Sequence, residues 1–295
     1  MKRPDILPSI ALLRARIGTW REAASRIALV PTMGALHAGH ISLANIAKDA
    51  AERTIVSIFV NPKQFAPGED FDQYPRTFEG DLDKLGAAGV DAVFAPPVSE
   101  IYPPGFATTI MLTGPAAAGL EDRFRPTHFQ GVATVVAKLL IAALPDVAIF
   151  GEKDFQQLRV IGRLVADLAL PVDIIGAPIA REQDGLAMSS RNAYLSASER
   201  AVAPVLNAIL RHCETGIRGG EAVAGVLDAG RADAAAAGFV LDYLELRDAE
   251  TLAPVAGPSD RPCRLLVAAY LGRTRLIDNI AILAPNAETE RKDPD

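Results

Sequence analysis

Two histidines three residues apart, His37 and His40, have the spacing in this chain that best suits chemistry on an anion. They follow a short apolar run, residues 27–30, that ends at a proline and is typical of a buried strand in a parallel sheet. Gly34 and Gly39 allow a tight turn after it, and the apolar spacing from residue 40 onwards is that of a helix. We therefore expect strand, turn and helix, with His40 in the first helical turn.

The first turn of a helix binds anions because its backbone N–H groups have no partner within the helix. An imidazole there can donate to a phosphate and stabilise the charge that builds up during group transfer. The alternative is that both histidines are ordinary surface residues of a loop, as in most H-x-x-H sequences. The preceding strand and the two glycines favour the anion site, and the pair is half of the four histidines in the chain.

A second candidate loop follows the apolar run 53–60. Asn61 and Gln64 lie directly after this run, and their amides can bond both hydroxyl and carboxylate oxygens. In an open parallel sheet, ligands bind beyond the carboxyl ends of the strands, so this loop is expected at the same edge as the histidines. The structural alternative is that the two amides cap a turn.

A third candidate loop follows the run 146–150. Lys153 can lie against ATP phosphates, and Asp154 can accept ribose hydroxyls or hold the lysine in place. Gln157, three residues after Asp154, is expected to begin a helix that faces the same pocket. The alternative is that the Lys-Asp pair is exposed to solvent on the protein surface and binds no ligand.

Composition limits the class of protein. With 295 residues, of which 49% are apolar and 22% charged, the chain should form about two globular domains. A net charge of −6 argues against general nucleic-acid binding. Cys213 and Cys263 are too few for a disulfide framework or a tetrahedral zinc site. No apolar run approaches the roughly 20 residues that cross a bilayer, and no signal-peptide core is present, so we expect a soluble cytoplasmic protein without a membrane partner.

The order of the expected elements predicts an α/β fold. Strands joined by a helix over so few residues form right-handed βαβ units, and therefore a Rossmann-like doubly wound parallel sheet is expected over residues 1–183. A further strand is a candidate at 107–114. Alanine-rich amphipathic helices and later apolar runs predict a smaller α+β domain over 184–283, and 284–295 are expected to be a disordered tail.

Five strings of the sequence resemble one family in the expected order. MGALHAGH at residues 33–40 resembles the H-x-G-H signature of the nucleotidylyltransferase superfamily, and the longer string from residue 31 resembles its pantothenate synthetase (pantoate–β-alanine ligase) family. Residues 59–65, 125–132 and 151–157 resemble further strings of that family. Met188-Ser-Ser-Arg191 resembles the Lys-Met-Ser-Lys-Ser loop of the superfamily, whose hydroxyls and cation can wrap a triphosphate.

This resemblance implies an enzyme that activates pantoate with ATP to pantoyl adenylate and pyrophosphate, after which β-alanine attacks and AMP leaves. It implies a homodimer, with ATP and Mg²⁺ as cofactors. The implied catalytic residues are His40, His37, Lys153, Ser189, Ser190 and Arg191. The implied ATP contacts are Pro31, Thr32, Met33, Gly34, His37, Gly39, His40, Gly151, Glu152, Lys153, Asp154, Ala180, Met188, Ser189, Ser190 and Arg191. The implied contacts to pantoate and β-alanine are Gln64, Asn61, His128, Gln157 and Arg125.

A magnesium ligand is implied near the start of the helix that follows residue 77. Asp81 is the candidate, although Gly80 stands where some relatives carry another acid. The structural alternative is that Glu79, Asp81 and Asp83 stabilise the N-terminal end of the helix dipole.

Other functions remain open at this point. Another H-x-G-H adenylyltransferase would share the histidine turn but not the strings around Asn61 and Gln157. A non-catalytic nucleotide-binding protein on the same fold is disfavoured by the intact His40 and Lys153. P-loop chemistry is disfavoured because the Walker string is absent, and a tRNA synthetase because no basic anticodon-binding domain is present.

Overall fold

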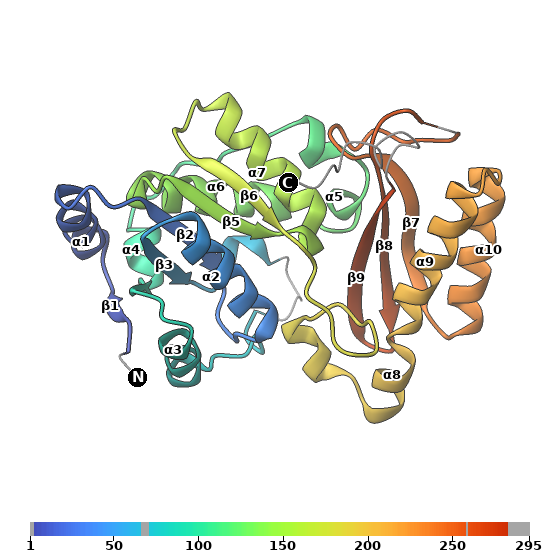
Figure 1. The fold of residues 1–295 in the computed structure, drawn as a ribbon, viewed down its shortest axis with the longest axis horizontal. Coiled ribbons are helices and arrows are strands. Elements are labelled where there is room, and N and C mark those ends of the chain that lie inside the picture. The colour runs from blue at the N-terminus through green and yellow to red at the C-terminus, as the bar shows by residue number, and fades with distance from the viewer. Residues whose placement is uncertain (1–2, 66–70, 258, 283–295) are drawn as a thin grey trace, which may run out of the picture. The chain divides into compact units, whose positions relative to one another are not determined.

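The polypeptide divides into two units, residues 1–180 and 181–295, each with its own sheet (Figure 1). The structure is a computed structural model that describes residues 3–65, 71–257 and 259–282. The predicted tail at 284–295 lies outside the described residues.

A six-stranded parallel sheet forms the centre of the first unit. Its strands are β1 (Asp5–Leu7), β2 (Ile27–Thr32), β3 (Arg53–Ile58), β4 (Ala92–Phe94), β5 (Val147–Gly151) and β6 (Asp173–Ala177). They lie in the order β1-β4-β3-β2-β5-β6, and every neighbouring pair is parallel. The strand order reverses between β2 and β5, which is where an open α/β sheet binds its ligands. The predicted doubly wound sheet is confirmed.

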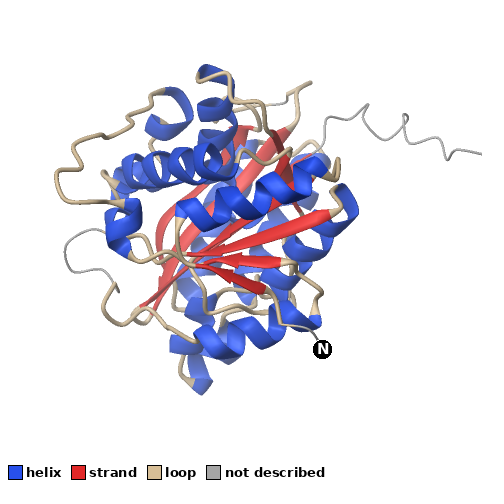
Figure 2. Ribbon diagram, turned by 90° about the vertical axis from the view of Figure 1, so that its left-hand side faces the viewer, coloured by secondary structure: helices blue, strands red, loops and turns tan. Residues whose placement is uncertain are grey.

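Helices cover both faces of this sheet (Figure 2). They are α1 (Ile10–Glu22), α2 (Ala38–Ala50), α3 (Phe78–Ala87), α4 (Val98–Ile101), α5 (Glu121–Phe124), α6 (His128–Ala143) and α7 (Phe155–Asp167). Short 3₁₀ turns lie at η1 (Pro62–Gln64), η2 (Gly114–Ala117) and η3 (Glu152–Asp154).

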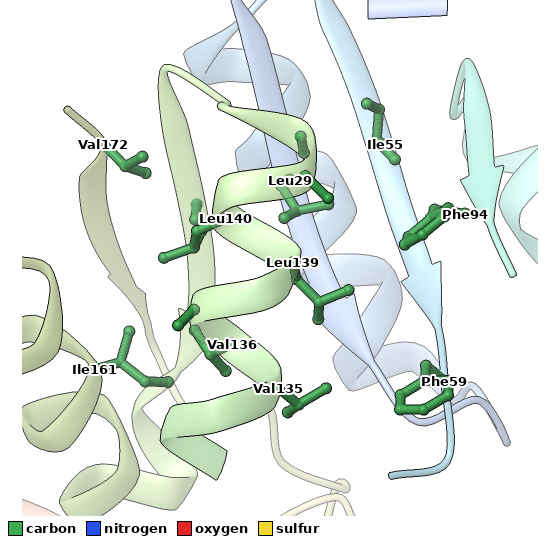
Figure 3. Packing of buried hydrophobic residues seen from close by; sticks show 14 of the residues in the cluster. Leu29, Ile55, Phe59, Phe94, Val135, Val136, Leu139, Leu140, Ile161 and Val172 are labelled. Atoms are coloured by element: carbon green, nitrogen blue, oxygen red, sulfur yellow. The ribbon is translucent and has the colours of Figure 1, made fainter. Parts of the chain in front are cut away.

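Alternation of side chains along β2 divides the core into two layers. Leu29 belongs to a buried cluster with residues of α1, α6 and α7, whereas Ala28 and Val30 belong to a second cluster with α2 and α3. In the first cluster, Leu139 and Leu140 of α6 face the sheet (Figure 3). Burial on both faces of the strands explains why they are continuous apolar runs.

The predicted strand at residues 107–114 is wrong. Residues 106–113 form no ladder, and η2 begins at Gly114. The N–H of Ile110 donates instead to Thr134 Oγ1 of α6 at 3.0 Å, and Ile110 and Leu112 pack against the core beside that helix. A segment that lies along a helix can form its backbone hydrogen bonds with side chains of that helix. The spacing of apolar residues in the sequence does not reveal this arrangement.

The second unit packs helices on a three-stranded antiparallel sheet. Its elements are η4 (Ser190–Tyr194), α8 (Ala197–Val202), α9 (Val205–Arg218), α10 (Val223–Ala236), β7 (Val240–Asp248), β8 (Cys263–Leu271) and β9 (Thr274–Ile282). Cys213 and Cys263 are both free and buried. In the described ranges, no helix is both long and apolar enough to cross a membrane.

Candidate active site

The turn between β2 and α2 contains two consecutive residues in the left-handed region. Gly34 has a φ of +80° and Ala35 a φ of 50°. This conformation costs an alanine about 1–2 kcal/mol, so neighbouring groups must hold the turn. The hydroxyl of Thr32 does so in part, because it donates to the carbonyl of Ser57 at 2.7 Å and accepts from the N–H of Gly34 at 3.2 Å.

His37 and His40 form a reciprocal cap at the start of α2. Nδ1 of His37 accepts a hydrogen bond from the N–H of Gly39 at 3.2 Å, and Nδ1 of His40 accepts one from the N–H of His37 at 3.3 Å. Because both Nδ1 atoms accept, each neutral ring carries its proton on Nε2. The ring centroids lie 4.1 Å apart. The pair therefore presents two N–H donors at the positive end of a helix.

The imidazole of His40 is neutral at ordinary pH. Burial, chiefly, and then the electrostatic effects of His37, Lys153 and Lys84 together lower its pKa to about 3. β2 and β5 are neighbouring parallel strands, so the loops that follow them lie at the same edge of the sheet. Two of the predicted loops, residues 31–40 and 151–157, are thus brought together.

Gly39 is required by the position of the His37 ring. A Cβ at Gly39 would lie 2.9 Å from two atoms of that ring and 3.4 Å from the Cβ of Ala180. Ala180, a predicted ATP contact that follows β6, therefore lies against the histidine turn.

Asn61 is fully buried and its amide is saturated by the protein. Its Nδ2 donates to Gln64 Oε1 at 3.0 Å and to the carbonyl of Gly131 at 3.1 Å. Its Oδ1 accepts from the N–H of Lys63 at 3.2 Å and from the hydroxyl of Tyr102 at 2.8 Å. An Asn amide has two donors and about two acceptor sites, so none is left for a substrate. The geometry favours a positioning role for Asn61, in place of the direct contact that the sequence predicts.

Arg125 and His128 hold Gln64 from the other side. Both lie at the carbonyl of Gln64, Nη2 of Arg125 at 3.2 Å and Nδ1 of His128 at 3.0 Å. Burial lowers the pKa of His128 to about 4, with the charge of Arg125 acting in the same direction. The neutral ring therefore donates from Nδ1 and can accept from Arg125 at Nε2, 3.4 Å away. These two predicted substrate contacts fix the backbone of a third.

The loop after β5 carries the predicted lysine. Nζ of Lys153 lies 3.9 Å from Oδ2 of Asp154, and the lysine side chain is mostly buried. Gln157 lies in the first turn of α7, as predicted. Its neighbour Gln156 was not predicted: it is buried, and its Nε2 donates at 2.8 Å both to the carbonyl of Pro115 and to Asp122. Its Oε1 also accepts from the N–H of Glu121 at 2.8 Å, so Gln156 joins α7 to the segment before it, and no feature of the sequence indicated these contacts.

The serine–arginine segment belongs to the second unit. Oγ of Ser189 caps η4 by accepting from the N–H of Arg191 at 3.3 Å. The preceding hairpin, which pairs Arg181 with Ala187, is anchored by two bonds from Arg181 to Asp278 of β9, at 2.7 and 2.9 Å. Met188 to Arg191 thus form a loop that is fixed to its own unit.

Asp81 lies in α3 and does not fit a resident magnesium site. Its side chain is 1% exposed, and its Oδ1 accepts from the N–H of Leu36 at 2.9 Å and from the hydroxyl of Thr77 at 3.1 Å. Its Oδ2 is buried without a hydrogen-bond partner among the described residues, but a single oxygen does not make a resident site for Mg²⁺, which takes near-octahedral oxygen ligands. Across the described ranges, no group of three or more His, Cys, Asp or Glu side chains could hold a metal ion.

The fold and this site together define a class of protein. A doubly wound parallel sheet, with two imidazole donors and a lysine beyond its switch point, is an α/β architecture suited to binding a phosphorylated nucleotide. The family model described as pantoate-beta-alanine ligase matches residues 5–281, and the chain belongs to this family of ligases.

Relatives and solved structures agree with this assignment. The chain is 56% identical to "Pantothenate synthetase" of Rhodopseudomonas palustris, covering 96% of this chain and 100% of the relative. It is 57% identical to "Pantothenate synthetase 2" of Bradyrhizobium diazoefficiens, covering 95% and 99%. A crystal structure of pantothenate synthetase from Thermus thermophilus matches with a TM-score of 0.89 and 45% identity, over 95% of this chain and 99% of that one.

A further solved structure is a complex with ligands. This is the pantoate-beta-alanine ligase of Francisella tularensis, complexed with beta-gamma ATP and beta-alanine. It matches with a TM-score of 0.79 and 34% identity, over 94% of this chain and 97% of that one.

Gly131→Ala should destabilise the protein. A Cβ at residue 131 would lie 2.1 Å from the carbonyl oxygen of Lys63, so α6 and η1 must separate. We expect a loss of about 1–3 kcal/mol in the free energy of unfolding, measured with urea, and faster hydrogen exchange at Gln64. Gly162→Ala in α7 is the control, since nothing lies within 4 Å of its Cβ. Equal stability of the two variants would contradict the tight contact.

Acid should destabilise the protein through its buried imidazoles. His40 and His128 have pKa values of about 3 and 4 in the folded protein, against 6.5 ordinarily, so the unfolded chain binds more protons between these values. The free energy of unfolding should fall as pH is lowered below about 6.5, by up to about 1.4 kcal/mol per pH unit for each ring. Urea unfolding between about pH 7 and 5 measures this slope. The slope should be shallower in His40→Gln, and an unchanged slope would refute the low pKa.

Proposed function

We propose that this protein condenses pantoate with β-alanine to pantothenate, using ATP, through a pantoyl-adenylate intermediate with release of pyrophosphate and AMP. Family membership over residues 5–281 is the observation that carries the proposal. The beta-gamma ATP and beta-alanine of the Francisella tularensis complex support ATP and β-alanine as ligands here too.

In the first step, the carboxylate of pantoate attacks the α-phosphorus of ATP, an O–P bond forms and the bond to pyrophosphate breaks. The carboxylate must approach from the side opposite pyrophosphate, so residues that orient pantoate contribute to the rate. Negative charge builds up on the phosphate oxygens, and the Nε2–H groups of His37 and His40 donate to them. His40 acts as a neutral donor because its pKa of about 3 leaves it no proton to give as an acid.

The remaining residues of the first unit bind and orient. Lys153 supplies a positively charged side chain near His40 for the outer phosphates. Gln64 and Gln157 orient pantoate through their amides. Asn61, Arg125 and His128 act on pantoate through Gln64, whose side chain and backbone they hold.

The second unit supplies the other phosphate contacts. Ser189, Ser190 and Arg191 close on the triphosphate and stabilise the departing pyrophosphate. On this proposal, residues 1–183 form the domain for ATP and pantoate, and residues 184–283 act as its lid. Closure excludes water from the acyl adenylate until β-alanine attacks the acyl carbon and AMP leaves.

Mg²⁺ enters this scheme with the substrate, as the counter-ion of the ATP phosphates. A Mg²⁺ ion typically binds through one or two carboxylates and the phosphates of its nucleotide, so no dedicated cage of protein ligands is required. The homodimeric state and the cytoplasmic location are proposed on the resemblance and the sequence alone. Sedimentation of the purified protein tests the first.

The defining experiment withholds β-alanine. With ATP, Mg²⁺ and pantoate, the protein should form pantoyl adenylate, detected by mass spectrometry after quenching, and added β-alanine should convert it to pantothenate and AMP. AMP formation that does not depend on pantoate would indicate a different adenylyltransferase. Absence of pyrophosphate release under all conditions would indicate a non-catalytic nucleotide-binding protein.

His40→Ala and Lys153→Ala should each lower the rate of adenylate formation at least about 100-fold, because each removes a group that stabilises transition-state charge. His212→Ala, on the exposed surface of α9, is the matched control and should keep the parental rate. Circular dichroism checks that the fold is kept. Parental rates in either site variant would remove that residue from the mechanism.

A further inference from the structure

We propose that Asp81 and Lys84 of α3 are positioning residues, which clamp Leu36 and thereby fix the directions in which His37 and His40 donate. The inference rests on the proposed function, because it names residues that serve the same phosphate site. Neither side chain needs to touch a substrate for this role.

The clamp grips both polar groups of Leu36. Oδ1 of Asp81 accepts from its N–H at 2.9 Å, and Nζ of Lys84 donates to its carbonyl at 2.5 Å. These groups belong to the two successive peptide planes on either side of the Leu36 α-carbon. Fixing both planes fixes the backbone dihedrals between them, and the next residue along the chain is His37.

Packing makes the clamp rigid. The side chain of Leu36 is 2% exposed, in the same core cluster as Leu82 and Leu85 of α3. The hydroxyl of Thr77 also donates to Asp81 at 3.1 Å, which holds the carboxylate in orientation. Leu36 is therefore attached to α3 by its side chain and by its backbone together.

The residues before Leu36 explain why a clamp is needed. Gly34 and Ala35 both lie in the left-handed region, so two residues in a sparsely populated conformation directly precede Leu36. Oδ2 of Asp81 is buried without a hydrogen-bond partner in the described part of the chain. A Cβ at Gly34 would lie 3.3 Å from that oxygen, so the turn passes directly over the carboxylate.

Lys84 also connects the clamp to the histidines by charge. After burial, its electrostatic effect is one of those that lower the pKa of His40, together with the effects of His37 and Lys153. Its ammonium lies 3.9 Å from Oδ1 of Asp81, and its side chain is 48% exposed. Lys84 can thus be replaced without leaving a buried cavity, which makes it the residue to test first.

Lys84→Met is compared with Lys84→Arg and with Lys48→Met. Lys48 is the matched control, since its Nζ also donates to a backbone carbonyl, that of Ala88 at 2.7 Å, but at the last turn of α2. The rate of pantoyl-adenylate formation at saturating ATP should fall about 10- to 100-fold in Lys84→Met, recover in part in Lys84→Arg, and stay unchanged in Lys48→Met.

A second readout needs no substrate. The nitrogen chemical shifts of His37 and His40, measured by NMR on the whole protein at neutral pH, report which ring nitrogen carries the proton. They should indicate the Nε2–H tautomer in the parental protein and in Lys48→Met, and a mixture of tautomers in Lys84→Met. Asp81→Asn, which keeps an acceptor for the N–H of Leu36, should retain the parental tautomer.

The outcomes separate the two proposals. Unchanged histidine shifts in Lys84→Met overturn the clamp, and if the rate nevertheless falls, Lys84 acts on the substrate directly. Changed shifts with a parental rate overturn the positioning role. Changed shifts, in a protein whose parental form makes no adenylate, support the clamp and refute the proposed function.

Discussion

The reciprocal cap between His37 and His40 is the interaction on which the site depends. Each imidazole uses Nδ1 to accept a main-chain N–H at the start of α2, and so its proton is confined to Nε2. An uncapped histidine would exchange between tautomers, and part of its population would present an acceptor to a phosphate. The cap therefore satisfies the helix terminus and selects the chemistry of both rings through the same two hydrogen bonds.

Elsewhere in the first unit, buried polar side chains form hydrogen bonds with other protein groups and so hold the residues of the site in place. Asn61 saturates its amide on Gln64, Gly131, Lys63 and Tyr102, and Asp81 uses its Oδ1 on Leu36 and Thr77. Buried polar groups are costly when unpaired, so the Asn61 amide, whose donors and acceptors are all used, has one satisfied arrangement. That arrangement restricts the positions open to the Gln64 side chain, to which Asn61 donates.

The sequence predicted what is local and missed what is distant. The strand, turn and helix at residues 27–50 are readable because their signals, an apolar run, two glycines and helical spacing, are adjacent in the chain. The saturation of Asn61 is not readable, since Tyr102 and Gly131 lie 41 and 70 residues away. In the sequence, Asp81 is simply an aspartate near the start of a helix. That position does not show whether its carboxylate binds a metal ion or the N–H of Leu36. Residues 107–114 look like a strand because their apolar spacing does not reveal that they pack along α6.

Neutral histidines can favour the transition state over the ground state in a way that lysines at the same positions would not. A permanent cation binds the charged triphosphate of the ground state about as well as that of the transition state, which tightens binding without lowering the barrier. A neutral N–H donor gains more as charge accumulates on the oxygen that it faces. Burial is the main cause of the low pKa that keeps His40 unprotonated, and the positive charges of Lys153 and Lys84 act in the same direction. The cations of the site thus have two effects: they attract phosphate, and they hold the neighbouring imidazole in the form that discriminates between the two states.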